Sequence, residues 1–220
     1  MNAIVRNSPL LARLDEDAIR ALIAMGHVRS LGTKETLVLE GSPANHVFLL
    51  QGGNARFFRV SEDGDDITLL WLAPGDVVGL GCLLAEHVTY LAHAQTVTAC
   101  EAFIWDRSQI RAFASSHPSI LENGMRISLQ YLAESIRRHI DLASKPPAVR
   151  LARSLLDLAH KVGRVDSSGI EIDITNEHLS TLSDLSPFTV SRLLASWSRS
   201  GELSKQRGKI ILRAPDALIQ

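Results

Sequence analysis

The spacing of apolar residues changes twice along this 220-residue chain. Residues 8–25 have apolar side chains at mixed spacings of three and four, which predicts short helices. From Thr36 to Asp106 the pattern becomes a series of short runs rich in Val, Leu, Phe and Thr, separated by Gly, Asn, Asp and Pro. Short strands at regular spacing with turn residues between them predict a small antiparallel barrel or roll.

A long helix is expected after His117-Pro118, reaching about Ser144, because the apolar period there is helical. One apolar set repeats at spacings close to those of a coiled-coil seam and predicts a dimer interface: Leu121, Met125, Leu129, Leu132, Ile136, Ile140 and Ala143. A second set, Ile120, Gly124, Ile127 and Tyr131, is placed to pack on the roll. The alternative is that both faces are buried within one chain.

Lys145-Pro146-Pro147 ends this helix, since proline cannot continue a helix interior and biases the residue before it away from the helical region. We therefore expect three parts. Residues 1–116 form the β-roll, residues 117–145 the long dimerisation helix, and residues 146–220 a separate C-terminal domain.

The C-terminal part predicts a helix-turn-helix. An amphipathic helix over residues 148–163 precedes a loop and a short strand, and Thr175 or Asn176 then caps a short helix. A tight turn at Asp184-Leu185 leads to Ser186, a strong N-cap, with Pro187 at the first helical position. This second helix is expected to run to Ser200, and Gly201 supplies its left-handed stop.

The second helix has two faces of different chemistry. Val190, Leu193, Leu194 and Trp197 form an inward stripe. The opposite face is small, polar and cationic: Ser191, Arg192, Ser196 and Arg199. Such a face fits the major groove of DNA, and the helix has the length of a recognition helix.

Beyond Gly201 the sequence alternates and turns through Arg207-Gly208-Lys209, which predicts a β-hairpin wing with cations at its tip. Charge is distributed unevenly along the chain. The whole chain has a net charge of −1, yet residues 186–213 contain six Lys and Arg against one Glu. A local basic surface of this kind favours a nucleic-acid site.

Composition restricts the class of protein. Hydrophobic residues make up 45% and charged residues 21% of the chain, which is typical of globular proteins. No apolar run has the length of a membrane helix, and the acidic N-terminus lacks the pattern of an export signal, so we expect a cytoplasmic protein without membrane contact. Cys82 and Cys100 are too few for a disulfide scaffold.

A roll whose residues 1–116 hold 13 Asp and Glu against 9 Lys and Arg, a long helix, a proline-bearing hinge and a winged helix-turn-helix, in this order, resemble the Crp/Fnr family of transcription regulators. The resemblance rests on LAPGDVVGLGCLL, the long-helix run from His117 to Lys145, RLARSLLDLA, and DLSPFTVSRLL with its wing RGKIIL. It implies an α+β fold: an N-terminal antiparallel β-roll like a cyclic-nucleotide-binding domain, a dimerisation helix and a C-terminal winged helix-turn-helix. It also implies a homodimer that binds a palindromic promoter site on double-stranded DNA and contacts RNA polymerase.

Carried over by position, the family's DNA-reading core corresponds to Thr189, Val190, Ser191 and Arg192, but Pro187 and Phe188 stand where the family usually has a pair ending in a base-reading Glu. Arg192 can donate to guanine, Ser191 can reach a base edge, and Phe188 can meet a thymine methyl or simply pack. Phosphate contacts are expected from Ser186, Thr189, Arg207 and Lys209.

The effector pocket departs most from the family pattern. Members that bind cyclic nucleotides have a Gly-Glu pair followed by an Arg-Ser or Arg-Thr pair, whereas here Gly79 is followed by Leu80, and Tyr90 and Leu91 replace the second pair. Ser135 and Ile136 occupy the positions of two adenine-binding hydroxyls. A buried phosphate without its cation costs several kcal/mol, so we expect no tight binding of cyclic AMP.

Other cofactors are also not expected. The iron–sulfur sensors of the family need N-terminal cysteines, and none precedes Cys82. Haem needs an axial ligand, for which His46, His87, His93 and Cys82 are the roll's candidates, although a lone His on a roll is more often an ordinary residue. Nothing in the sequence indicates a lowered pKa for Cys82 or a metal site.

The leading hypothesis is a homodimeric DNA-binding regulator with an unknown effector or none. An enzyme is not supported, because GxSxG, HExxH, CxxC and P-loop motifs are absent from the sequence. A third hypothesis is an effector-sensing protein, for haem or another small ligand, with weakened or lost DNA binding, motivated by Pro187 and Phe188.

Overall fold

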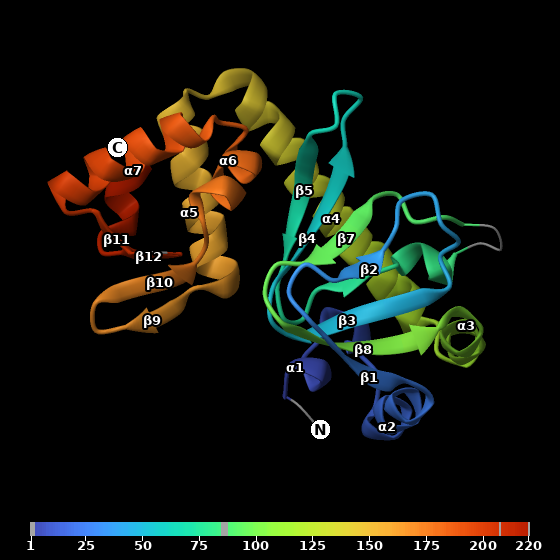
Figure 1. The fold of residues 1–220 in the computed structure, drawn as a ribbon. Helices are drawn as coiled ribbons and strands as arrows, with labels where there is room; N and C mark the ends of the chain where they lie inside the picture. The colour runs from blue at the N-terminus through green and yellow to red at the C-terminus, as the bar shows by residue number, and fades with distance from the viewer. Residues whose placement is uncertain (1–2, 85–87, 207, 220) are drawn as a thin grey trace. The chain divides into compact units, whose positions relative to one another are not determined.

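The computed structural model describes residues 3–84, 88–206 and 208–219 (Figure 1). The chain divides into two compact units, residues 1–64 with 69–134 and residues 65–68 with 135–220. The division falls inside the long helix α4 (Ser119–Ser144). Each unit is described by itself.

The first unit is the antiparallel roll that the sequence predicts. One sheet has the strand order β1-β8-β3-β6 and the other the order β2-β7-β4-β5. The strands are β1 (His27–Leu31), β2 (Thr36–Val38), β3 (His46–Gly52), β4 (Ala55–Val60), β5 (Asp66–Leu72, of which residues 69–72 fall in this unit), β6 (Val77–Val78), β7 (His93–Thr96) and β8 (Cys100–Asp106). Its helical segments are α1 (Ala3–Arg6), η1 (Pro9–Leu11), α2 (Glu16–Met25), η2 (Leu80–Leu83) and α3 (Arg107–Ser116).

Strand β1 is not predicted by the apolar pattern, because four of its five residues are exposed and only Leu31 is buried. It forms through pairing along β8, from His27 opposite Ile104 to Leu31 opposite Cys100. Figure 1 shows β1, β8 and β3 side by side. An edge strand of this kind depends on backbone hydrogen bonds rather than on burial of its side chains.

The core of the first unit lies between its sheets and helices. Among its largest fully buried side chains are Trp105, Leu22, Leu49, Leu50, Ile110 and Ile120. The indole of Trp105 donates a 2.8 Å hydrogen bond to the carbonyl of Leu22, which joins α2 to β8. The short helices predicted over residues 8–25 are thus present as η1 and α2, and α2 packs on β8.

The second unit is the winged helix-turn-helix. Its helices are α5 (Pro147–Val162), α6 (Asn176–Ser183), α7 (Pro187–Ser200) and the terminal η3 (Pro215–Ile219). Its sheet has the order β11-β12-β10-β9, formed by β9 (Arg164–Asp166), β10 (Gly169–Asp173), β11 (Leu203–Gln206) and β12 (Lys209–Leu212). Residues 164–166, expected as loop, form strand β9 because they pair with β10 across a short turn.

Two ion pairs in this unit connect α5 to the C-terminal part of α4. Arg137 donates to both carboxylate oxygens of Asp157, and Arg153 pairs with Asp141, which is only 8% exposed. The two helices meet at Lys145-Pro146, where Pro147 opens α5 at a position that needs no N–H donor.

Candidate DNA-binding surface and effector region

Helix α7 begins and ends where the sequence predicts. The hydroxyl of Ser186 accepts the N–H of Thr189 at 3.1 Å and lies 2.9 Å from the hydroxyl of that residue. Gly201 ends the helix at φ 91°, a left-handed conformation with little steric cost for glycine. In the first turn Pro187 has no N–H, and the N–H groups of Thr189 and Val190 bond to the side chain and the carbonyl of Ser186, so the N–H of Phe188 is left for an anion.

The two faces of α7 differ as the amphipathic pattern predicts. Val190 and Leu194 are completely buried, and Leu193 and Trp197 are half-buried. The other face is exposed, and the side chains there are Ser191, Arg192, Ser196 and Arg199. Phe188 is 77% exposed, so its ring is not used for packing in this structure.

The turn before α7 is held by backbone and ionic contacts. Thr175 caps α6 by accepting the N–H of His178, and Asp184 ends it at φ 51°. The carboxylate of Asp184 lies 3.6 Å from the guanidinium of Arg150 on α5. Arg138 of α4 donates a 2.8 Å hydrogen bond to the carbonyl of Thr181, and burial lowers the pKa of this arginine. These contacts fix how α6 presents α7.

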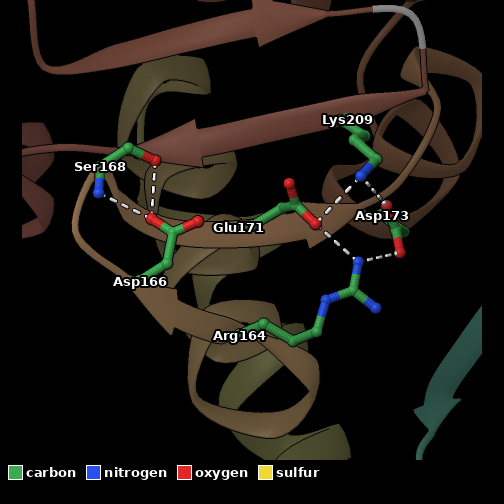
Figure 2. Close-up of polar contacts among 6 residues, drawn as sticks. All are labelled: Arg164, Asp166, Ser168, Glu171, Asp173 and Lys209. Carbon is green, nitrogen blue, oxygen red and sulfur yellow. Dashed lines mark hydrogen bonds and ion pairs between the residues drawn. The ribbon is translucent and has the colours of Figure 1, made fainter.

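The wing places Lys209 in an ion-pair cluster with two carboxylates, shown in Figure 2. Its ammonium nitrogen lies 3.0 Å from Oε1 of Glu171 and 3.8 Å from Oδ1 of Asp173. Lys209 was predicted from its position in the hairpin, but its acidic partners on β10 were not. Arg207, predicted to hold a phosphate with it, lies outside the described residues.

Gly79 and Tyr90 are adjacent in the roll. Gly79 has φ 87°, and a Cβ there would lie 2.3 Å from the carbonyl oxygen of His46 and 3.3 Å from the Tyr90 ring. The Tyr90 hydroxyl donates to that carbonyl at 3.0 Å and accepts the His46 N–H at 3.1 Å. Tyr90 is 8% exposed, and its burial raises its pKa. Its hydroxyl is thus engaged by the protein's own backbone.

The Cys82 thiol lies in the same region. Its sulfur is 3.0 Å from the carbonyl oxygen of Ala44 and 3.3 Å from that of His46. Burial raises the pKa of Cys82 to about 11, and the nearby Arg107 only partly opposes this. At neutral pH the group is therefore a protonated thiol, which is a poor nucleophile and metal ligand.

The other predicted pocket residues do not gather around this point. Leu80 is half-buried beside α4, near Gly124, whereas Leu91 is 79% exposed. Ser135 and Ile136 are exposed residues of α4 that belong to the second unit.

The predicted haem ligands have other partners in the roll. His46 lies 3.2 Å from a carboxylate oxygen of Asp106, and His93 stacks on Phe58. His87 lies outside the described residues, and within those that are described no three His, Cys, Asp or Glu side chains form a metal-binding group.

A cleft of about 350 Å³ between the roll and α4 is lined by residues that sequence reasoning did not select as a site, among them Asp76, Gln130, Tyr131 and Glu134. The Tyr131 hydroxyl accepts the N–H of Val77 at 3.0 Å and donates to the carbonyl of that residue at 3.2 Å. Burial raises its pKa well above the usual value. The Tyr131 hydroxyl thus attaches α4 to Val77, the first residue of β6.

The two apolar sets of α4 have different surroundings. On the side facing the roll, Ile120 and Ile127 are 0% and 3% exposed. The seam residues are exposed: Leu121 by 37%, Met125 by 54%, Leu129 by 57%, Leu132 by 54%, Ile136 by 52% and Ile140 by 55%, and Ala143 is also exposed. The alternative that one chain buries both faces does not hold for this structure.

Within the described residues, no helix is long and apolar enough to span a membrane.

Comparison with known proteins agrees with both units. Residues 28–117 match the cyclic nucleotide-binding domain model and residues 149–220 the Crp-like helix-turn-helix domain model. The CRP-like cAMP-activated global transcriptional regulator of Mycobacterium tuberculosis is 24% identical, over 96% of this chain and 95% of that protein.

Two solved structures share the fold. FixK2 from Bradyrhizobium japonicum has a TM-score of 0.77 at 21% identity, over 88% of this chain and 95% of that one. The c-di-GMP responsive global regulator CLP of Xanthomonas campestris has a TM-score of 0.76 at 21% identity, over 90% and 99%.

Proposed function

Because this chain belongs to the Crp/Fnr family of transcription regulators, whose helix-turn-helix binds DNA, we propose that it acts as a homodimer on a two-fold symmetric site and is not controlled by cyclic AMP. The observation that carries the proposal is α7: a capped helix with a buried stripe and an exposed face containing Ser191 and Arg192. The proposal includes no enzymatic activity.

Each residue of this face has a specific part in DNA binding. Arg192 donates to O6 and N7 of a guanine, and Ser191 contacts a neighbouring base edge. Phe188 is exposed enough to reach a thymine methyl, while Ser186 and Thr189 lie at the helix N-terminus, where a backbone phosphate is favoured. With Pro187 and Phe188 in place of the usual pair, the preferred sequence differs from that of better-known members.

The exposed seam of α4 supports a dimer of this chain. Six large apolar side chains along one helix face leave an apolar stripe in water, and pairing two such helices removes it. A dimer also presents two copies of α7 to DNA about 34 Å apart, which matches one turn of the duplex. The site is then palindromic because the dimer has a two-fold axis.

The proposed independence from cyclic AMP is supported by the chemistry around Gly79. Leu80 offers no carboxylate for a ribose hydroxyl, and Tyr90 offers no cation for a phosphate. The hydroxyl of Tyr90 is occupied by the backbone of His46. A cyclic nucleotide here must break these hydrogen bonds, and neither Tyr90 nor Leu91 gives its phosphate a cation in return. We therefore assign the roll no effector or cofactor.

We further propose, as the family resemblance implies, that the protein is a cytoplasmic regulator and that it contacts RNA polymerase.

Selection of bound sequences from random double-stranded DNA tests the function directly. We expect enrichment of a palindrome whose half-sites are about 10 base pairs apart, each with a guanine for Arg192. Failure to enrich any sequence would contradict the DNA-binding proposal. Enrichment of a single half-site would contradict its dimeric form.

Sedimentation velocity at micromolar concentration tests the dimer. Wild-type protein should sediment as a dimer, and Leu129→Glu, which introduces a charge into the seam, should give monomers. Leu91→Glu is the matched control, because Leu91 is exposed on the roll and outside the seam. A wild-type monomer, or equal behaviour of the two variants, would refute the seam as the interface.

Titration calorimetry with cyclic AMP tests the effector proposal. We expect no saturable heat at millimolar nucleotide, because Tyr90 and Leu91 stand where the family has the arginine that neutralises the phosphate. A dissociation constant in the micromolar range or tighter would show that other residues bind the nucleotide.

A further inference from the structure

Four charged residues of the winged domain form one cluster on adjacent strands (Figure 2). Glu171 and Asp173 are two residues apart on β10, so their side chains lie on the same face of the sheet. Asp173 is opposite Lys209 on β12, and Glu171 is opposite Arg164 on β9. Strand register therefore places each carboxylate next to a cation from a neighbouring strand.

The distances show that both carboxylates are shared. Arg164 Nη2 lies 2.6 Å from an oxygen of Glu171 and 2.6 Å from an oxygen of Asp173. Lys209 Nζ donates a 3.0 Å hydrogen bond to Glu171 and lies 3.8 Å from Asp173. The hydrogen bond from Arg164, followed by that from Lys209, holds the pKa of Glu171 below its usual range. At neutral pH the cluster contains two positive and two negative charges.

Lys209 belongs to the hairpin that follows the proposed DNA-binding helix α7. It begins β12, directly after the wing turn at Gly208, and β12 pairs with β11, which packs against α7. Its side chain remains 41% exposed, so a phosphate can approach it. Of the two cations predicted at the wing tip, Arg207 and Lys209, only Lys209 lies within the described residues.

The cations of α7 are in a different situation. Arg192 and Arg199 are exposed, and the described residues provide neither with an ion-pair partner. The basic surface of the winged domain thus has an uncompensated part on α7 and a compensated part at Lys209.

This difference has a consequence for DNA affinity. Cations that neutralise phosphates release condensed counterions, which provides most of the sequence-independent affinity for DNA. A lysine already paired with carboxylates must exchange one anion for another, and the carboxylates also repel the phosphate. Paired in this way, Lys209 contributes little to that affinity.

We propose that Glu171 and Asp173 limit sequence-independent DNA binding by occupying Lys209 in ion pairs, so that the affinity of the domain depends mainly on base contacts made by α7. The two carboxylates take the place of a DNA phosphate within the protein. This inference depends on the proposed DNA binding through α7 and the wing.

The test is the salt dependence of binding to a random-sequence duplex. The variant Glu171→Gln/Asp173→Asn should bind about 5-fold more tightly than wild type near 0.1 M KCl, and its plot of log affinity against log salt should be steeper by about 0.9, the value for one more phosphate contact. The matched control is Asp166→Asn, which removes a carboxylate at the β9–β10 turn that is bonded to Ser168 and, within the described residues, to no cation (Figure 2). It should leave the slope unchanged.

Lys209→Gln, alone and combined with the double variant, identifies the cation. When Lys209→Gln is added to the double variant, the gain in affinity and the steeper salt slope should both disappear. If the double variant binds no more tightly than Asp166→Asn, or if its gain persists without Lys209, the proposal is wrong. The single variant Glu171→Gln, with about half the effect, keeps the test valid if the double variant does not fold.

Wild-type binding to its selected site separates this inference from the proposed function. If wild type binds that site and the double variant shows no steeper slope, only the role of Glu171 and Asp173 is refuted. If wild type binds neither the selected nor the random duplex, the proposed function itself fails.

Discussion

The polar groups around Gly79 in the roll are buried, whereas the polar groups on the outer face of α7 in the winged domain are exposed to water. The Tyr90 hydroxyl and the Cys82 thiol have backbone partners in the roll, and both residues are buried. On α7, Ser191 and Arg192 are exposed, and the described residues offer Arg192 no carboxylate. Both regions are rich in groups that can form hydrogen bonds, but those groups are in opposite states.

The difference shows how to judge whether a predicted site can bind a ligand. A hydrogen-bonding group that the protein already satisfies must lose its partner before it can bind anything else, and a buried unsatisfied group costs about 1–3 kcal/mol. A group that faces water exchanges one partner for another at little cost. By this criterion the exposed groups of α7 can exchange water for DNA, the Tyr90 hydroxyl is already used by the protein, and Lys209 lies between these two cases.

Among the variants that test this difference between α7 and the roll, Arg192→Ala should have the largest effect, which is a loss of DNA affinity. Loss of a bidentate guanine contact is worth about 1–3 kcal/mol, so affinity for the selected site should fall about 5- to 150-fold and discrimination at that guanine should be lost. Thermal stability should not change, because the side chain is exposed. Fluorescence anisotropy with matched and mismatched duplexes measures both.

Arg199→Ala is the control for this substitution, since Arg199 is also exposed on α7 but in its last turn. It should weaken binding to all sequences alike. If Arg192→Ala also weakens binding uniformly, Arg192 contacts a phosphate and not a base.

Gly79→Ala should have the next largest effect, this time on stability. The new Cβ combines a left-handed φ of 87° with a 2.3 Å approach to the His46 carbonyl, so we expect a loss of about 2–3 kcal/mol in the free energy of unfolding. Urea denaturation measures it. Gly64→Ala is the control, because Gly64 has a similar φ of 89° but no atom within 4 Å of the added Cβ, and it should cost about 1 kcal/mol. Equal losses would show that the close contact is unimportant.

Tyr90→Phe should cost about 1–2 kcal/mol, since it removes both hydrogen bonds to His46 and leaves polar backbone atoms without that partner. DNA affinity of the folded protein should remain within 2-fold of wild type. Urea denaturation and anisotropy give the two values. A variant with wild-type stability would indicate that water replaces the hydroxyl, and the region would then be more open than we describe.

The smallest effect at neutral pH concerns Cys82. Its pKa of about 11 lies above the ordinary thiol value of 9.0, so the folded protein retains a proton that the unfolded chain loses between these two pH values. Stability should therefore fall as pH rises from 9 to 11, and alkylation of Cys82 by iodoacetamide should accelerate about tenfold per pH unit up to 11. Mass spectrometry of wild type and Cys82→Ser follows the reaction. Complete alkylation within minutes at pH 7 would contradict the closed state of this region.

Local sequence signals were sufficient for α7 and for the order of elements. Ser186, Pro187 and Gly201 specify the helix ends through their own backbone and side-chain chemistry, and the period of its apolar residues specifies the buried face. The same reasoning separated the two sets of α4, because side chains three and four residues apart share a helix face wherever the helix lies.

Strand pairing was less accessible from the sequence. Residues 27–31 and 164–166 have little apolar pattern, yet both pair as strands because a neighbouring strand offers free backbone groups. A strand is predicted from sequence by the pattern of apolar side chains that it buries. These two segments bury few of their side chains, so the pattern is missing.

By itself, the sequence determined the family, the fold class and the cationic face of α7, because these depend on residue order, spacing and local caps. Only the tertiary structure decided which of the predicted groups are already occupied. Tyr90 is bound to His46, 44 residues away, and Lys209 to Glu171, 38 residues away. Such contacts depend on strand register and chain crossing, which bring together residues whose separation along the chain carries no signal of their meeting.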